Sequence, residues 1–281
     1  ESRWNRAQED YSLIGLMWEN DHGLSPDGRL QAEELRRRLK TAKDMLDDPD
    51  RPRRGLADAR MTRDLLSPDR VLASPFTRAA CTACLGFHDI LATGKPLELM
   101  KELRETKNLG GADSTGVAVG DEIHAHLKEE IGALYADDGE APRERAEREF
   151  DDLALDTSDV AEEWWAGLTG DSEEAMEERL NALAGRLRET RGSLPGGGGV
   201  AIAIGHSLSF REFFRRTVGE PAEERHKETL ASLRTHVLPH CGVVGARLSW
   251  DSAGRCRVEA VEHLLGTQLR SAEPSAEAHA V

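Results

Sequence analysis

The stretch VAIAIGHSLSFREFFRR at residues 200–216 decides the fold class that we expect for this chain. Residues 200–204 form a short, continuous apolar run rich in β-branched side chains, which is typical of a strand covered on both faces in a parallel sheet. A glycine breaks the run, and the capping-box spacing of Ser209 and Glu212 predicts that a helix starts there. His206 therefore lies where a strand ends and a helix begins.

Such a junction suits an anionic ligand. In open α/β sheets, ligands bind at the carboxyl ends of the strands, and the free amides and the dipole at a helix start favour negative charge. The alternative is that the ring of His206 is hydrogen-bonded within a turn and has no ligand. The stretch alone does not decide between these two interpretations.

A second junction of the same kind precedes it in the chain. Residues 71–73 are apolar and strand-like, and a helix is expected from Thr77 to about Leu91. Arg78 lies in the first turn of this helix, where its positive charge opposes the helix dipole. A bound anion would offset that electrostatic cost, which favours an anion-binding role for Arg78.

These junctions predict an α/β protein whose mostly parallel sheet carries helices on both faces. We expect residues 71–73, 200–204 and 243–249 to share one sheet, with the last of them also forming a hairpin with residues 256–261. Serine followed by proline at Ser25 predicts a helix start there.

The apolar face of that helix is expected to include Leu30, Ala32, Leu35 and Leu39. Asp171 is the predicted N-cap of a later helix, with acidic residues in the first turn.

We interpret residues 1–270 as one α/β domain. Residues 106–170 lack an alternating strand–helix rhythm, so we read them as an inserted, mainly helical cap. The tryptophan pair Trp164 and Trp165 closes this region, and packing is favoured over substrate contact as its role. The small, polar segment 271–281 is predicted to be a disordered tail.

Composition narrows the classes of partner. The chain has 281 residues, a formal net charge of −15 and a pI near 5.2, which argues against binding to nucleic acid or to anionic membrane surfaces. No apolar run approaches the ~20 residues of a membrane span. Four cysteines form neither a disulfide framework at this length nor, with the histidines, a convincing zinc set. A reducing, cytoplasmic location fits best.

Five short motifs, taken in order, resemble the histidine phosphatase superfamily, the phosphoglycerate mutase-like enzymes, over most of the chain. The motifs are ESRWN at 1–5, LSPDG at 24–28 followed by Gln31 and Ala32, SPFTRA at 74–79, LRE at 103–105 and GHS at 205–207. Each motif is weak alone, and their order and separations make the resemblance specific.

The resemblance implies transfer of a phosphoryl group to a histidine and then to water or another acceptor, without a metal or another cofactor. Arg78 would hold phosphate oxygens by bidentate bonds, and His206 would stabilise the transferring group. Asn5 would donate to a phosphate oxygen, and Ser207 would offer its backbone amide. Glu105 would be the general acid for the leaving group, provided that its surroundings raise its pKa.

Several alternatives stay open. Glu102 is the acid if the register of the LRE motif slips. Residues 105–109 read ETKNL where mutases of the family have Glu-Arg-x-Tyr-Gly, so a phosphatase acting on a phosphorylated small molecule or a phosphoprotein is favoured over a phosphoglycerate mutase. A non-catalytic phosphate-binding or interaction domain is the third reading. The sequence does not specify the substrate or the oligomeric state.

The resemblance also places the nucleophilic histidine and a first arginine immediately before Glu1, at the end of the first strand of the sheet. We therefore expect the natural protein to carry an Arg-His-Gly motif upstream of Glu1. Residues 1–281 alone are expected to lack turnover and to fold weakly, because that strand belongs inside the sheet.

Overall fold

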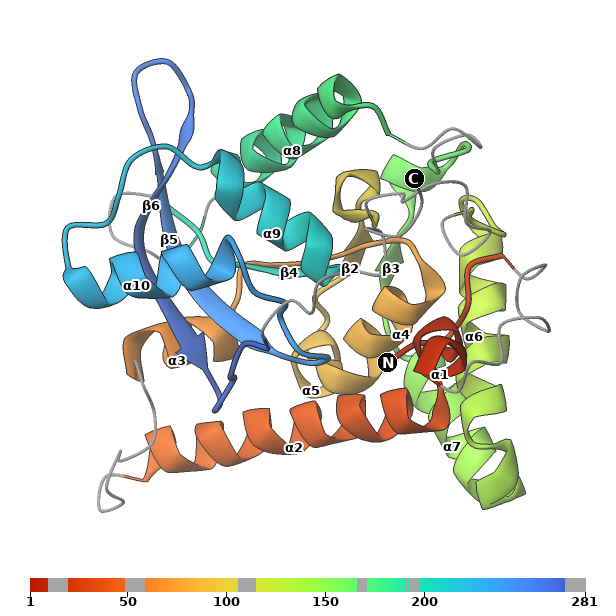
Figure 1. Cartoon of the computed structure of the whole chain (residues 1–281). Helices are drawn as coiled ribbons and strands as arrows, with labels where there is room; N and C mark the ends of the chain where they lie inside the picture. The colour runs from red at the N-terminus through yellow and green to blue at the C-terminus, as the bar shows by residue number, and fades with distance from the viewer. Residues whose placement is uncertain are drawn as a thin grey trace.

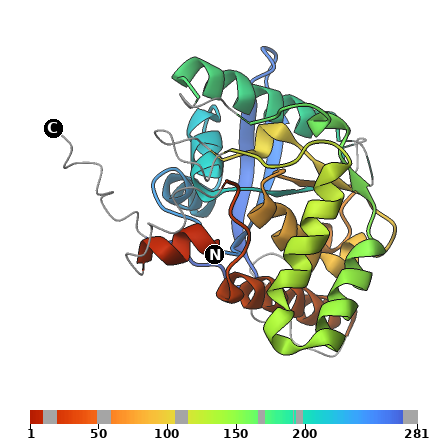
Figure 2. The same ribbon diagram turned by 90° about the vertical axis from the view of Figure 1, so that its right-hand side faces the viewer.

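The computed structural model in Figures 1 and 2 describes most of the chain. The described residues are 1–9, 20–48, 59–105, 115–165, 171–190, 192 and 198–270. The segment expected to be a disordered tail, 271–281, lies outside the described residues. So do both ends of the expected cap insertion, 106–114 and 166–170.

A four-stranded, all-parallel sheet forms the centre of the molecule. Its strands are β1 (Arg70–Ala73), β2 (Leu97–Leu99), β3 (Leu155–Asp156) and β4 (Ala201–Ile204), in the order β3-β2-β1-β4. The predicted parallel sheet is thus confirmed. Three of the four residues of β1 are fully buried, as expected for an apolar strand covered on both faces.

The hairpin of β5 (Val243–Trp250) and β6 (Cys256–Leu264) is antiparallel, as predicted, but it forms a sheet of its own. The prediction that residues 243–249 share a sheet with β1 and β4 is therefore wrong. The physical reason is that a cavity, described below, separates β5 from β4. The hairpin packs instead on α3 (Ala59–Leu66) and α10 (Glu224–Leu233).

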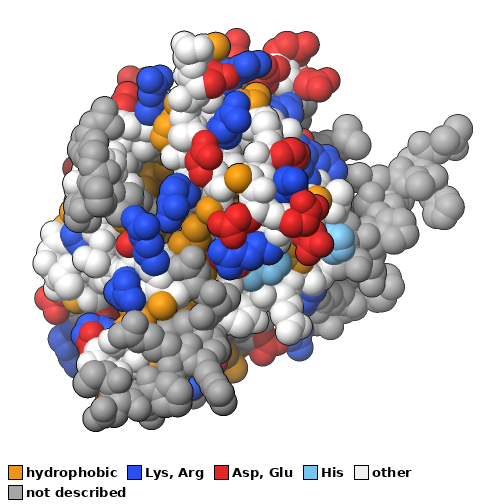
Figure 3. All heavy atoms as spheres, turned by 90° about the vertical axis from the view of Figure 1, so that its left-hand side faces the viewer, with side chains coloured by type: hydrophobic (Ala, Val, Ile, Leu, Met, Phe, Trp, Pro, Cys, Tyr) orange, Lys and Arg blue, Asp and Glu red, His pale blue; other side chains and the backbone are white. Residues whose placement is uncertain are grey.

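Helices cover both faces of the parallel sheet. In both views α2 (Pro26–Asp47) lies below the sheet and α8 (Glu173–Arg188) above it (Figures 1 and 2). Alternate residues of β1 supply the two cores: Val71 and Ala73 pack with the core on the α2 side, and Leu72 with the core on the α8 side. The surface seen in Figure 3 shows charges of both signs with apolar side chains between them.

The start of α2 follows the prediction. The Ser25 hydroxyl accepts the amide hydrogen of Gly28 at 3.0 Å, and Pro26 is the first helical residue. Leu35 and its neighbours at helical spacing are buried. Leu30 is 52% exposed, so its place on the apolar face is wrong, because the buried positions are spaced by three and four residues and it falls between them.

Two other helix starts differ from the prediction. In α9 (Ser207–Arg216) the cap position is His206, so the helix begins before Ser209, whose hydroxyl bonds elsewhere. In α8 the cap is Ser172, whose hydroxyl accepts the Ala175 amide hydrogen at 3.2 Å. Asp171 is not the cap, because its carboxylate is engaged by Arg104 and Arg179.

The helix expected from Thr77 to Leu91 is divided into α4 (Thr77–Gly86) and α5 (His88–Leu91), with Phe87 between them. The remaining helices of the described segments are α1 (Arg3–Glu9), α6 (Glu122–Leu134), α7 (Glu140–Asp151) and the short 3₁₀ helices η2 (Lys101–Leu103), η4 (Ala136–Asp138) and η5 (Ser158–Val160). None of the described helices is both long and apolar enough to cross a membrane.

The region read as a cap contributes to the main core. Leu127 and Ile131 of α6 are fully buried in the same apolar cluster as β1 and α4, and β3 extends the central sheet. Trp164 packs edge-on against Phe76 with ring centroids 4.9 Å apart and donates to the Ala118 carbonyl, which agrees with the packing role favoured from the sequence.

Gly28 allows the N-terminal residues to lie against α2, because a Cβ at this position would stand 2.0 Å from the Glu1 carbonyl oxygen. We expect Gly28→Ala to lower the free energy of unfolding by ~1–3 kcal/mol, even though alanine is the better helix former. The matched control is Gly185→Ala in α8, where a Cβ meets nothing within 4 Å and a gain of ~0.5–1 kcal/mol is expected. Urea unfolding measures both changes, and a neutral or stabilising Gly28→Ala contradicts the close approach.

Candidate active site

Three strand ends deliver side chains to one cavity at the carboxyl edge of the sheet. Arg78 follows β1, Glu105 follows β2 and η2, and His206 follows β4. Asn5, in α1, lines the same cavity, which has a volume of about 1150 Å³. The structure thus brings together residues that are far apart in the sequence, because parallel strands end at a common edge.

His206 is buried, with 7% of its surface exposed, and both ring nitrogens have neighbours. Nε2 lies 2.9 Å from the Ser74 hydroxyl, and Nδ1 lies 3.4 Å from a carboxylate oxygen of Glu105. An ionised carboxylate only accepts, so this arrangement favours the tautomer with the proton on Nδ1 and with Ser74 donating to Nε2. Burial, and then the charges of Arg78 and Arg179, hold the pKa of His206 well below its ordinary value, so the ring is neutral at pH 7.

The order Ser74, His206, Glu105 has the connectivity of a serine-hydrolase triad. Ser74, however, is fully buried and is not among the residues that line the cavity, so its hydroxyl has no route to a substrate there. Ser74 therefore orients the imidazole of His206.

Arg78 and His206 both pack on the ring of Phe76. The guanidinium carbon of Arg78 lies 4.8 Å from the centroid of this ring, and the imidazole of His206 meets it edge-on at 5.7 Å. Phe76 is itself fully buried, so it is a rigid support for both groups. The guanidinium of Arg78 is therefore held over the ring of Phe76 by a cation–π contact.

Hydrogen bonds within the protein fix the side chains of Asn5 and Ser207 at the cavity. The Asn5 side-chain oxygen accepts from the backbone amide and hydroxyl of Ser2, at 3.1 and 2.8 Å, so its Nδ2 group is the one that could donate to a ligand. The Ser207 hydroxyl accepts from the Leu238 amide at 2.8 Å and so ties the start of α9 to the segment before β5.

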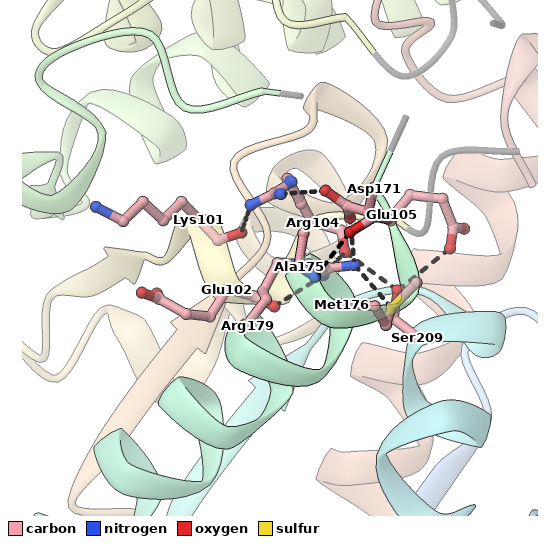
Figure 4. Close-up of polar contacts among 10 residues, drawn as sticks. Lys101, Glu102, Arg104, Glu105, Asp171, Ala175, Met176, Arg179 and Ser209 are labelled. Carbon is pink, nitrogen blue, oxygen red and sulfur yellow. Dashed lines mark hydrogen bonds and ion pairs between the residues drawn. The ribbon is translucent and has the colours of Figure 1, made fainter. Parts of the chain in front are cut away.

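Of the two acidic candidates, Glu105 lines the cavity and Glu102 does not. Glu105 accepts from the Ser209 hydroxyl at 3.3 Å and lines the cavity, whereas Glu102 points to the opposite side (Figure 4). Burial and the neighbouring Asp159 raise the pKa of Glu102, away from the cavity. Of the two registers left open by the sequence, the one that uses Glu105 agrees with the structure.

A buried ionic cluster holds the loop that carries Glu105. The Arg179 guanidinium, from α8, donates to the carbonyls of Glu102 and Arg104 at 3.1 and 2.7 Å and to Asp171 at 3.0 Å (Figure 4). Asp171 also accepts from Arg104 at 2.6 Å. Burial and the charge of Arg104 lower the pKa of Arg179, but arginine remains protonated at neutral pH.

Sequence reasoning missed this cluster and the roles of Ser74 and Ser209. The spacing of Arg179 was a signal of its burial, because it lies three residues after Met176 and four before Leu183 on the buried face of α8. A buried charge is costly unless it is paired, so a partner for Arg179 could have been expected. Ser209 gave a misleading signal, because its spacing from Glu212 imitates a capping box.

No protein-family model and no curated protein sequence matches this chain. Within the described residues, no three His, Cys, Asp or Glu side chains are grouped so that they could hold a metal ion. Cys81 and Cys84 are buried inside α4, and burial raises the pKa of both thiols.

Removing Arg179 should deprive Asp171 and the backbone carbonyls of Glu102 and Arg104 of a hydrogen-bond donor. We expect Arg179→Met to lower the free energy of unfolding by ~3–5 kcal/mol. The control is Arg186→Met on the same helix, where the side chain is 40% exposed and pairs with Asp159, and a loss under ~1 kcal/mol is expected. Urea unfolding of the two variants measures the difference. Equal losses of unfolding free energy would contradict the buried position of the Arg179 ion pair and hydrogen bonds.

The depressed pKa of His206 makes stability depend on pH. Because the unfolded chain binds a proton more readily than the folded one, this contribution is complete above about pH 6.5 and is lost as the pH falls below it. His206→Gln should flatten the decline in unfolding free energy between about pH 6.5 and pH 5, by up to ~1.4 kcal/mol per pH unit. Burial lowers the pKa of His240 to about 4. Part of the pH dependence of the unfolding free energy therefore remains in His206→Gln. Parallel pH profiles for the two proteins would contradict this assignment.

Proposed function

We propose that the intact protein is a phosphoryl-transfer enzyme, a metal-independent phosphomonoester hydrolase that works through a phosphohistidine. The observation that supports this most is the convergence of Arg78, Glu105 and His206 on one cavity from three separate strand ends. A guanidinium, an imidazole and a carboxylic acid are the groups that bind a phosphate ester and protonate its leaving oxygen.

Each group has a role that its surroundings allow. Arg78 holds two phosphate oxygens, and the Nδ2 group of Asn5 donates to another. His206 stabilises the transferring group, whose negative charge spreads over the equatorial oxygens, and Ser74 limits the rotation of its ring. Beside the bound phosphate dianion Glu105 takes up a proton, which it gives to the leaving oxygen, and once ionised it activates the water that attacks the phosphohistidine.

The nucleophile in this proposal is a histidine joined to the chain just before Glu1. Glu1 lines the same cavity as Arg78 and His206, and the charge of Arg78 acts on the Glu1 amine, which supports a nucleophile at this place. His206 is a poor candidate for the attack, because Ser74 and Glu105 already occupy both of its ring nitrogens. The substrate is a phosphorylated small molecule or a phosphoprotein.

The same observation supports a second candidate, a non-catalytic phosphate-binding domain. If no histidine precedes Glu1 in the natural protein, Arg78, Asn5 and His206 remain as binding groups with neither attack nor turnover. Inorganic phosphate would then bind to residues 1–281, and Arg78→Ala would abolish that binding.

The enzyme is tested with a form of the protein extended upstream of Glu1 through Arg-His-Gly. We expect it to hydrolyse p-nitrophenyl phosphate without added metal and equally well in EDTA. His206→Ala and Arg78→Ala should each lower kcat/KM by about 10²-fold or more, because both stabilise charge in the transition state. Glu105→Gln should slow alkyl phosphates more than p-nitrophenyl phosphate, because a poor leaving group needs the proton.

The matched control is Arg215→Ala, an arginine on the outer side of α9 that pairs with Glu212 and should leave activity unchanged. Full activity in Arg78→Ala would refute the assignment. Phosphate binding that depends on Arg78, without turnover in the extended form, would select the binding domain.

A further inference from the structure

The first turn of α4 holds Arg78, but the residue before the helix does not cap it. The N-cap position is Phe76, whose side chain makes no capping hydrogen bond. The first amides of a helix have no partner within the helix, and the positive charge of Arg78 opposes the helix dipole at this end. The start of α4 therefore depends on a contact from another part of the chain.

Asp21 makes that contact with Thr77, the first residue of α4. One carboxylate oxygen accepts the Thr77 amide hydrogen at 2.9 Å, and the other accepts the Thr77 hydroxyl hydrogen at 2.8 Å. Both residues are buried, with 4% of Asp21 and 1% of Thr77 exposed, so water does not readily replace either bond. Asp21 thus caps α4 from a distant segment, with a charge that the helix dipole favours.

The backbone of Asp21 is held in an uncommon conformation. Its φ is 47°, in the left-handed region that aspartate and asparagine adopt more easily than other non-glycine residues. Such a conformation persists where the surroundings hold it. The adjacent ring of His22 is fully buried and packs on Trp4, with ring centroids 5.3 Å apart. The Gly23 carbonyl accepts the Arg3 amide hydrogen of α1 at 3.0 Å.

The Thr77 hydroxyl also joins Asp21 to α6. Its oxygen lies 2.9 Å from Nε2 of His126. Because an ionised carboxylate only accepts, the hydroxyl hydrogen points to Asp21, and Nε2 of His126 donates to the hydroxyl oxygen. Hydrogen bonds at Thr77 therefore join the segment before α2, the start of α4 and α6 around the residue that precedes Arg78.

We propose that Asp21 is a positioning residue for Arg78. With both carboxylate oxygens on Thr77 it fixes the first turn of α4, and this turn places the guanidinium of Arg78 over the ring of Phe76. Asp21 does not line the cavity, so it acts through the helix start and not on a ligand. Its effect on phosphate rests on the proposed function, whereas the placement of Arg78 can be measured without a ligand.

The placement is tested in the form of the protein extended upstream through Arg-His-Gly, with no phosphate added. The side-chain Nε–Hε NMR signal of Arg78, identified by its loss in Arg78→Lys, reports on the aromatic ring beneath the guanidinium. Asp21→Asn keeps the size and the left-handed preference of the residue but offers one acceptor oxygen in place of two. We expect this substitution to move the signal toward that of an arginine without a ring contact.

The hydroxyl provides a second pair of variants. Thr77→Val removes it and should move the Arg78 signal in the same direction, whereas Thr77→Ser keeps it and should leave the signal in place. If Asp21→Asn does not fold, this pair decides. The matched control for the aspartate is Asp121→Asn at the N-cap of α6, where the side chain makes no capping bond and no shift is expected. An Arg78 signal that is unchanged in the folded Asp21 and Thr77→Val variants would overturn the proposal.

Turnover of p-nitrophenyl phosphate measures the consequence for the site. We expect Asp21→Asn to lower kcat/KM by about 10-fold, because a small displacement of a group that binds the substrate is costly. In an Arg78→Ala background the same substitution should change kcat/KM by less than about 2-fold, because the effect passes through Arg78. Equal fold losses in the two backgrounds would show a general structural effect and would reject the positioning role.

The proposed function can fail separately. If Arg78→Ala leaves turnover intact, the catalytic assignment of Arg78 is wrong, and the NMR signal still decides whether Asp21 positions its guanidinium. If the extended form has no turnover, the same pairs of variants are compared by their Kd for inorganic phosphate. Weakening by Asp21→Asn only when Arg78 is present supports the proposal, and equal weakening in both backgrounds rejects it.

Discussion

The parallel pairing of β1 with β4 is the constraint on which the site depends. Ala73 is in register with Ile204, and the Ser74 amide donates to the Ile204 carbonyl at 2.8 Å. This register ends both strands at the same level, so that Ser74 and His206 face each other at hydrogen-bond distance. A shift of one residue would turn alternate side chains to the opposite face and separate the pair.

The site is cationic within an acidic protein. With a formal net charge of −15, the surface as a whole repels anions, yet Arg78 and Arg179 act together on the buried ring of His206. Their charges and the burial favour the neutral imidazole. Phosphate binding would reverse part of this balance, because a dianion beside the ring compensates the arginine charges and raises the pKa of the imidazole.

The acidic residue of the site is positioned by a cluster of Arg104, Asp171 and Arg179, which lies outside the cavity lining. Arg179 fixes the backbone of the loop at Glu102 and Arg104, and Ser209 of α9 reaches across to Glu105. The two helices on one face of the sheet thus place the carboxylate against His206. Buried ionic groups of this kind add little to net stability, so positional specificity is the more reasonable account of their presence.

Much of the architecture was determined by local sequence. The apolar runs of β1 and β4, the Ser25 cap and the hairpin of β5 and β6 were recognisable because their patterns depend on neighbours a few residues away. Arg78 and His206 could be chosen as candidates for the same reason, since each follows a strand, whereas Glu105 was chosen from the resemblance of its motif. Tertiary structure alone decided the features that depend on contacts between residues far apart in the sequence. These are the burial of Arg179 with Asp171, the hydrogen bond from Ser209 to Glu105, and the separation of β5 from β4. These outcomes depend on which surfaces meet and which space is left between them, and neither hydrophobic periodicity nor capping preference carries that information.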